Sequence, residues 1–454
     1  MLTFGTDGVR GEFGKELTET YAANLAEVAA QILQCKKIVI GRDTRESGLA
    51  LENAIAEALT RVGVEVQLMG VAPTPAIAFA AHTHGVVAIA ITASHNLFQD
   101  NGIKIFAAGG LKLSDDQQAS IEREMIERDS ALRDGARTKS EASNKAASDN
   151  QKLGAERPEL LREYCDWLVD LVPRDAFKNL HVALDCANGA FSFVAPEVFS
   201  KLGATVTTVN ATPDGRNINL QCGATHPSAL VEVVKSVGAN FGVAFDGDGD
   251  RLIAVDDKGQ IVDGDHLLAI SVLNMKTQGA LRGNKVVVTV MTNIGFHKAM
   301  KSAGIEVLTT PVGDRSVLLA LEESSLSLGG EQSGHIIYRD FATTGDGLLA
   351  AIKLATFVAE SKKTLNEVAI NAMTSFPQVL INLRIAKRIE SVESTFRSEI
   401  EAAEKALGES GRVLVRASGT EPMVRVMVEA PQQEDAEQVA ATLADAISAR
   451  LGDS

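Results

Sequence analysis

The stretches "KKIVIGRD" (residues 36–43) and "ALTRVGVEVQLMG" (58–70) decide the fold of this chain. The first is a lysine-led apolar run that ends in a polar loop, which is typical of a buried strand. The second is typical of the end of a helix, a glycine and a short alternating strand. Strand, loop, helix, glycine and strand in this order predict a parallel crossover unit.

This order recurs twice along the chain. It is found again in "HVALDCANG" (181–189) with "VFSKLGATVTTVN" (198–210), and in "KVVVTVMTN" (285–293) with "AMKSAGIEVLTTP" (299–311). Residues 373–454 differ, because two strand-like stretches there alternate with alanine-rich helical ones. We therefore predict three related α/β domains with mixed or parallel sheets and a smaller C-terminal α+β domain, over residues 1–157, 158–256, 257–372 and 373–454.

Composition limits the classes of function. The 454 residues carry a formal net charge of −15 and only 4% aromatic residues, which argues against nucleic-acid binding. A small anionic ligand remains compatible, because a local pocket acts at short range. The four cysteines fit neither a zinc pattern nor a disulfide framework, and no segment resembles a signal peptide or a membrane span. We expect a soluble, cytoplasmic protein in which residues 129–157, polar and without apolar periodicity, form an exposed, mobile excursion.

Each repeated unit leads to a polar loop at the same topological place. Each loop stands at the end of one of the stretches "GVVAIAITASHN" (85–96), "NFGVAFDGDGDR" (240–251) and "LSLGGEQSGH" (326–335). In open α/β sheets ligands bind beyond the carboxyl ends of the strands, so we expect these loops to carry the chemistry.

Ser94 is the candidate reactive group of the first loop. Thr92 and Asn96 stand where a nucleophile elbow needs glycines. His95 is not expected to act as its base, because neighbouring side chains on an extended segment point to opposite faces. A role as an ordinary turn residue remains the alternative.

The second loop predicts a magnesium site. Asp246, Asp248 and Asp250 alternate with glycines, so an extended backbone would direct all three carboxylates to one side. Hard oxygen donors suit Mg²⁺. The EF-hand pattern fails, because Arg251 stands where its glycine is required, and a solvated acidic turn is the simpler alternative. A divalent ion beside a serine indicates phosphoryl transfer.

Two further loops predict anion and sugar contacts. In "RASGTEP" (416–422) the side chains and wrapped backbone predict an anion pocket or an ordinary turn. In "GGEQSGH" (329–335), Glu331 and Ser333 would lie on one face and pair with sugar hydroxyls. His335 has either a structural role or a role in proton transfer.

Together, "TASHN", "DGDGDR", "GEQSGH" and "RASGTEP" resemble, in order and spacing, the four active-site loops of the α-D-phosphohexomutases, over nearly the whole chain. "FGTDGVRG" (4–11), "DNGIK" (100–104), "TTGDG" (343–347) and Gln332 resemble the branch that interconverts glucosamine 6-phosphate and glucosamine 1-phosphate. Leu97 departs from the family pattern, which usually has proline there. A mutase of glucose or mannose phosphates of the same family, an Asp-nucleophile phosphatase acting through Asp246, and a non-catalytic sugar-phosphate sensor remain alternatives.

The resemblance implies a heart-shaped, four-domain enzyme around a central cleft, with phosphorylated Ser94 and a hexosamine 1,6-bisphosphate as intermediate and activator. It implies one Mg²⁺ per chain, held by Ser94 and the three aspartates. The other implied residues are Arg10, Lys104 and His335 for proton-transfer assistance, Glu331 and Ser333 for the sugar, and Arg416, Ser418, Gly419, Thr420 and Arg425 for the phosphate. The expected partner is a small phosphosugar, with no nucleic acid and no membrane, and a homodimer is one expected assembly.

Overall fold

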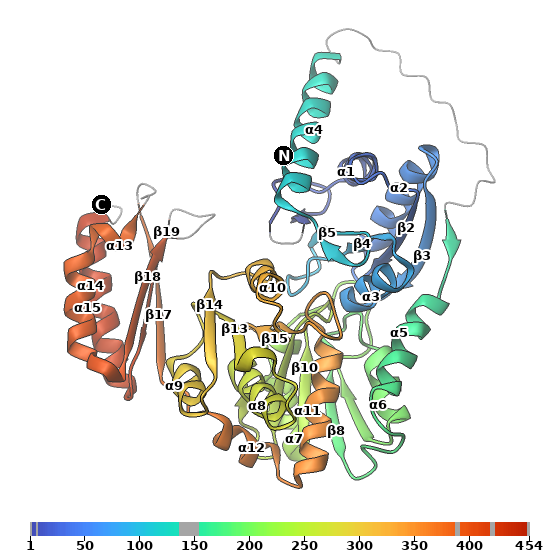
Figure 1. Ribbon diagram of the computed structural model, residues 1–454. Coiled ribbons are helices and arrows are strands. Elements are labelled where there is room, and N and C mark those ends of the chain that lie inside the picture. Colours follow the sequence, from blue (N-terminus) through green and yellow to red (C-terminus); the bar gives the residue numbers. More distant parts are fainter. Residues whose placement is uncertain (1, 6–7, 136–153, 386–390, 418–422, 452–454) are drawn as a thin grey trace. The chain divides into compact units, whose positions relative to one another are not determined.

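The computed structural model describes residues 2–5, 8–135, 154–385, 391–417 and 423–451 (Figure 1). These residues belong to two compact units. The first comprises Met1–Val290 and Val307–Ala369, and the second comprises Met291–Glu306 and Ile370–Ser454.

The first sheet has the strand order β1-β5-β4-β2-β3-β7, and β6 pairs with β5. Its strands are β1 (Gly8–Glu12), β2 (Lys37–Arg42), β3 (Glu65–Val71), β4 (Val87–Ile91), β5 (Asp100–Ala107), β6 (Leu111–Lys112) and β7 (Ala155–Glu156). β2 runs parallel to β3 and β4, whereas β5 is antiparallel to β4 and β1. The predicted mixed sheet is thus confirmed, and β4 is buried along its whole length, as its apolar sequence indicates.

Helices cover both faces of this sheet. They are α1 (Glu19–Ile32), α2 (Gly48–Arg61), α3 (Thr74–His84), α4 (Asp115–Gly135) and α5 (Glu159–Asp170). α2 packs on β2 and β3, and α3 packs on β2 and β4. Ile38 and Ile40 of β2 join the core with Leu25 of α1 and Ile55 of α2, because alternate residues of a strand share a face.

The segment expected to be an exposed, mobile excursion, residues 129–157, has regular secondary structure at both ends, and its short strand β7 is exposed as expected. α4 continues to Gly135, and β7 adds a short parallel strand beside β3, with Gln67 opposite Ala155. The main-chain groups on the outer side of β3 offer partners to the returning chain. Residues 136–153 lie outside the described part of the chain.

The second sheet has the order β12-β11-β10-β8-β9 and the third β14-β13-β15-β16. Their strands are β8 (His181–Asp185), β9 (Thr205–Val209), β10 (Phe241–Phe245), β11 (Leu252–Asp256), β12 (Ile261–Val262), β13 (Lys285–Thr289), β14 (Glu306–Thr310), β15 (Leu328–Gly330) and β16 (Ile336–Tyr338). β8 is parallel to β9 and β10, and β13 is parallel to β15. The helices along this part of the chain are α6 (Val194–Lys201), α7 (Ser228–Val237), α8 (Gly264–Thr277), α10 (Asp314–Glu323), α11 (Gly347–Ser361) and α12 (Leu365–Ala372), whereas α9 (Ile294–Ser302) belongs to the second unit.

Helices α8 and α11 contact each other and connect these two sheets (Figure 1). Both pack on β11 of the second sheet, while α8 also contacts β15 and α11 contacts β16 of the third. The glycines predicted to end the repeated helices, Gly63, Gly203 and Gly304, all have positive φ. The helix, glycine and strand pattern is therefore confirmed in all three repeats.

The second unit contains a sheet of order β17-β19-β18, formed by β17 (Gln378–Arg384), β18 (Arg412–Ala417) and β19 (Met423–Glu429). Its later helices are α13 (Val392–Thr395), α14 (Arg397–Leu407) and α15 (Gln433–Leu451). All its described strand pairs are antiparallel, and α15 packs on β17 and β19. The predicted C-terminal α+β arrangement is confirmed.

Candidate active site

The serine loop and the aspartate loop meet at the carboxyl ends of their strands. Ser94 follows β4 and Asp246 follows β10 directly, and Ser94 Oγ donates a hydrogen bond of 2.7 Å to Asp246 Oδ2. Both residues are buried, with exposed fractions of 2% and 1%. A hydroxyl and a carboxylate from two repeated units thus form the centre of the site.

The three aspartates converge as predicted. One carboxylate oxygen from each of Asp246, Asp248 and Asp250 lies within 4.8 Å of the other two. The prediction that an extended backbone aligns the three carboxylates is wrong. Gly249 has φ 79, and its N–H donates to the Asp246 carbonyl in a turn. The turn brings the carboxylates together.

Lys104 and Thr74 hold the aspartates from the first domain. Lys104 Nζ lies 2.8 Å from both Asp248 Oδ2 and Asp250 Oδ2. Thr74, at the start of α3, donates its hydroxyl to Asp248 Oδ2 at 2.6 Å and its main-chain N–H to the Asp248 carbonyl. The loop is therefore fixed through both its main chain and its side chains.

The donor set fits a hard divalent cation. Asp248 Oδ1 and Asp250 Oδ1 are buried and have no hydrogen-bond partner among the described residues. Buried acceptors without a partner call for an ion or a water. Carboxylate and hydroxyl oxygens at this spacing suit Mg²⁺, which keeps further positions for water or phosphate oxygen.

Burial and neighbouring charge separate the aspartates electrostatically. Burial, followed by the charges of Asp250 and Asp248, raises the pKa of Asp246 well above its usual value. Burial also opposes ionisation of Asp250, but Lys104, His335 and Arg251 outweigh it and hold the Asp250 pKa well below its usual value. Asp250, which contacts Lys104, is therefore stabilised in its carboxylate form.

The expectation that His95 points away from Ser94 is wrong. Its Nδ1 lies 3.3 Å from Ser94 Oγ, because Ser94 adopts φ 52 and the segment is not extended. Burial, with Arg251 and Arg10 nearby, lowers the pKa of His95 to about 4. Arg10 of β1 donates to Asn96 Oδ1 at 3.0 Å, so it borders the same loop.

The predicted sugar loop is also a turn. The Glu331 N–H donates to the His335 carbonyl, and Gly334 N–H donates to the Glu331 carbonyl, so the argument from an extended segment does not apply. Glu331 Oε1 accepts the N–H of Gly313 at 3.0 Å, and Ser333 is exposed. These contacts connect Glu331 to the "VGDRS" loop (312–316).

His335 lies at the edge of the aspartate cluster. Its Nδ1 is 3.7 Å from Asp250 Oδ1, and Gly345 N–H donates to its Nε2 at 3.2 Å. Burial lowers its pKa, but the Asp250 carboxylate outweighs burial and the net shift is upward. The Asp250 carboxylate thus favours a proton on Nδ1, while an Nε2 that accepts the Gly345 N–H carries no proton.

The predicted phosphate residues lie in the second unit. Arg416 of β18 and Arg425 of β19 are directly opposite each other. Burial, followed by the charge of Arg425, lowers the pKa of Arg416. Ser418, Gly419 and Thr420 lie outside the described residues.

Sequence reasoning gave no role to Thr74, Arg45, Asn219 and Arg251, all of which contact this site. Arg251 lies 3.8 Å from Asp250 and is the last residue of the "DGDGDR" motif. Its place in that motif could have identified it as a residue of the site. Thr74 lies 174 positions from Asp248, and Arg45 and Asn219 lie 49 and 125 positions from Ser94. The sequence gave no local signal for these three.

Models of the phosphoglucomutase/phosphomannomutase α/β/α domains I, II and III match residues 1–132, 162–259 and 263–376, and the model of the C-terminal domain matches residues 380–446. Phosphoglucosamine mutase of Bacillus cytotoxicus is 44% identical over 455 residues, and that of Streptococcus pneumoniae strain 70585 is 43% identical over 459 residues. Each alignment covers 99% of this chain and 99% of the relative.

Solved structures share the fold. A phosphoglucomutase/phosphomannomutase family protein from Burkholderia thailandensis has a TM-score of 0.80 at 23% identity, with 100% of both chains covered. Aspergillus fumigatus N-acetylphosphoglucosamine mutase, in complex with GlcNAc-6P and magnesium, has a TM-score of 0.68 at 18% identity, with 98% of this chain and 95% of that chain covered.

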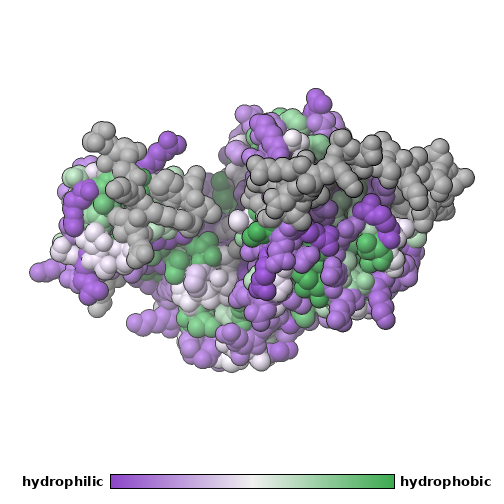
Figure 2. All heavy atoms as spheres, turned by 90° about the horizontal axis from the view of Figure 1, so that it is seen from above, coloured by the Kyte–Doolittle hydropathy of each residue, from purple (hydrophilic) through white to green (hydrophobic). Residues whose placement is uncertain are grey.

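Within the described part of the chain, no helix is both long enough and apolar enough to cross a bilayer. On the face that Figure 2 shows, the described residues are mainly hydrophilic, and hydrophobic residues form separate patches.

Proposed function

This chain belongs to the phosphoglucomutase/phosphomannomutase family, and we propose that it interconverts glucosamine 6-phosphate and glucosamine 1-phosphate. The observation that carries this proposal is the Ser94 hydroxyl held on Asp246 inside a cluster of three carboxylates. The relatives that match nearly the whole chain at 43–44% identity are phosphoglucosamine mutases, which supports the amino sugar as substrate.

Ser94 is the proposed phosphate carrier. Phosphorylated Ser94 donates its phosphoryl group to the free hydroxyl of the monophosphate, so that the P–O bond to the serine breaks as a bond to the sugar oxygen forms. The hydroxyl proton leaves to a nearby base, and a 1,6-bisphosphate results. After the bisphosphate has turned, Ser94 recovers a phosphoryl group from its other end.

Asp246, Asp248, Asp250 and the Ser94 oxygen would hold one Mg²⁺ per chain. The ion, when bound, offsets negative charge on the transferring phosphoryl group. Lys104 fixes the orientation of Asp248 and Asp250 through its two contacts of 2.8 Å. The Oδ1 atoms of the same two aspartates, which are buried without a hydrogen-bond partner among the described residues, support this assignment.

The remaining assignments follow from chemistry. Arg10, Lys104 and His335 assist proton transfer near the serine, and Glu331 with Ser333 binds sugar hydroxyls. We assign phosphate binding to the loop of Arg416, Ser418, Gly419, Thr420 and Arg425. A cytoplasmic location and a homodimer belong to the same proposal.

The decisive experiment compares turnover of purified protein on glucosamine, glucose and mannose phosphates under identical conditions. We expect the highest kcat/KM with glucosamine phosphate. A higher kcat/KM with glucose or mannose phosphate would assign the chain to another activity of the family.

The metal assignment has its own test. We expect Asp248→Asn to weaken Mg²⁺ binding and to lower kcat, because a neutral amide replaces one of three anionic ligands. The loss of transition-state stabilisation should amount to several kcal/mol. Titration of activity with Mg²⁺ and with a chelator measures this. Full activity of the variant in excess chelator would contradict the proposed site.

An aspartyl-phosphate mechanism is distinguished chemically. If Asp246 were the nucleophile, the phosphoenzyme would be an acyl phosphate, which hydroxylamine cleaves, whereas phosphoserine resists it. Asp246 Oδ2 already accepts the Ser94 hydroxyl, which favours the serine as the carrier.

A further inference from the structure

A single buried arginine gathers the carbonyl groups of the serine loop. The Arg45 side chain has an exposed fraction of 0%, and its Nε donates to Asp43 Oδ2. Its Nη1 donates to the carbonyls of Leu97 and Asp100, and its Nη2 donates to those of Ser94 and Asn96. All five N–H groups of the guanidinium are therefore accounted for, four by carbonyls of residues 94–100 and one by Asp43.

The same cluster also fixes the entry to the loop. Asp43 Oδ2 accepts the Thr92 hydroxyl at 2.7 Å, and Thr92 Oγ1 accepts the main-chain N–H of Ser94 at 2.9 Å. A continuous set of hydrogen bonds thus runs from Arg45 through Asp43 and Thr92 to the serine.

Residues of the second domain also contact the serine loop. Asn219 Nδ2 donates to the carbonyls of Ser94 and Asn96 at 2.8 and 2.9 Å. Gly247, between the first two aspartates, lies so close that a Cβ there would be 2.7 Å from the Ser94 carbonyl oxygen. The serine loop therefore fits between two domains with no room for a side chain at position 247.

This clustering compensates for an unfavourable backbone. Ser94 has φ 52, in the left-handed region that residues other than glycine seldom adopt. Such a conformation persists only where the surrounding structure over-determines it, and it is often found at functional sites. It directs Ser94 Oγ at Asp246, while the four carbonyls of the loop turn to Arg45.

We propose that Arg45, together with Asn219, is a positioning residue that holds Ser94 in line for phosphoryl transfer. Its donors are bound to main-chain carbonyls and Asp43, so it acts through the loop and not on the sugar. This role rests on the proposed function, because it assumes that Ser94 carries the phosphoryl group.

The test replaces Arg45 by methionine and by lysine. We expect Arg45→Met to lower kcat roughly 100-fold, the effect of misplacing a reacting group by about 1 Å, with KM changed less than about threefold. Arg45→Lys keeps a cation beside Asp43 but offers only three donors, so we expect it to recover part of the lost kcat. Asn219→Ala should lower kcat in the same direction by a smaller factor.

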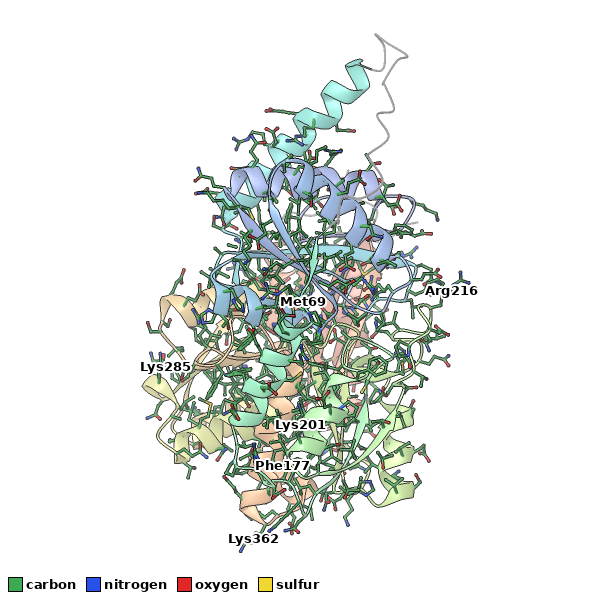
Figure 3. All side chains as sticks on the ribbon, turned by 90° about the vertical axis from the view of Figure 1, so that its right-hand side faces the viewer. Met69, Phe177, Lys201, Arg216, Lys285 and Lys362 are labelled. Atoms are coloured by element: carbon green, nitrogen blue, oxygen red, sulfur yellow. The ribbon has the colours of Figure 1, made fainter. Side chains whose placement is uncertain are left out.

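Arg216→Met is the matched control. Arg216 pairs with Glu46 at 2.7 Å across the same two domains, but its side chain is 69% exposed and projects outward (Figure 3). It contacts the side chain of Phe98 and no main-chain carbonyl of the serine loop in the described interactions. We expect its kcat to match that of the wild type.

Leu59→Ala controls for loss of stability. Leu59 of α2 lies in the core with an exposed fraction of 0%, and it is not among the residues that donate to the loop carbonyls. This variant should melt at a lower temperature and keep its kcat. If it lost kcat as strongly as Arg45→Met at equal loss of stability, the positioning role would be refuted.

Hydrogen exchange gives a readout that needs no substrate. In Arg45→Met, the amides of residues 92–100 should exchange faster than in wild type, while those of α2 change little. Unchanged exchange of this segment, or an unchanged kcat, would overturn the proposal. A wild-type enzyme inactive on hexosamine phosphates would instead contradict the proposed function, and the exchange result would still decide whether Arg45 holds the loop.

Discussion

Thr74→Val tests how the proposed magnesium site is oriented. Valine keeps the branched shape of threonine and its main-chain N–H, so the bond of 2.9 Å from residue 74 to the Asp248 carbonyl should remain. The substitution removes only the hydroxyl that lies 2.6 Å from Asp248 Oδ2. Any change in metal binding can then be attributed to the orientation of one carboxylate.

The expected magnitude follows from the contact. Thr74 and Asp248 are each only 1% exposed, and the acceptor is a carboxylate. A buried hydrogen bond to a charged group contributes about 1.5–3 kcal/mol, roughly a factor of 10 to 150. Because partners that orient a metal ligand typically change affinity by about 10–100-fold, we expect a loss of that size in Mg²⁺ affinity.

The assay is a titration of initial rate with free Mg²⁺ at saturating glucosamine 6-phosphate, alongside calorimetric Mg²⁺ binding. Thr310→Val is the control, since the Thr310 hydroxyl lies 3.2 Å from the neutral carbonyl of Val288 and is also buried. We expect this control to bind Mg²⁺ normally and to lose only about 1 kcal/mol of stability. If Thr74→Val bound Mg²⁺ within twofold of wild type at unchanged kcat, the reasoning would be refuted.

Three further outcomes are expected. Ser94→Ala should fold, lose essentially all mutase activity and carry no phosphate, and intact-mass detection of phosphate on a different residue of active enzyme would contradict this. Gln332→Met should lower the ratio of kcat/KM for glucosamine phosphate to that for glucose phosphate without affecting phosphoserine formation. An unchanged ratio would rule out Gln332 as the source of selectivity and leave Arg315, whose Nη2 lies 2.6 Å from Asp115, as the next candidate. Burial raises the pKa of Asp346 from 3.8 to about 6, so between these values the folded state holds a proton that the unfolded state has released, and stability falls as pH rises. Asp346→Asn should remove this fall, which amounts to at most about 3 kcal/mol, and unfolding measured from pH 4 to 7 would show equal slopes for both proteins if the assignment were wrong.

The opposite outcomes for Ser94 and His95 show what a local pattern can predict. The apolar run that ends at Ile91 correctly located Ser94 beyond the end of a strand. Period-two reasoning then separated Ser94 from His95, and the structure brings them within 3.3 Å. The periodicity rule failed because a left-handed residue reverses the direction of the chain.

The sequence by itself determined the repeated α/β units, the positions of their polar loops and the chemical types of the proposed ligands. These features depend on apolar periodicity, glycine placement and side-chain chemistry, which act over a few residues. It also identified Asp246, Asp248 and Asp250 as a group, although through an extended backbone that the chain does not adopt.

Only the tertiary structure decided which distant groups meet. Thr74 lies on Asp248, Lys104 bridges two aspartates, and Arg45 with Asn219 gathers the carbonyls around Ser94. Such contacts join residues up to 174 positions apart, as for Thr74 and Asp248, and leave no trace in local spacing. Their physical cause is the packing of separate sheets and helices, which brings buried polar groups together and requires that each find a partner.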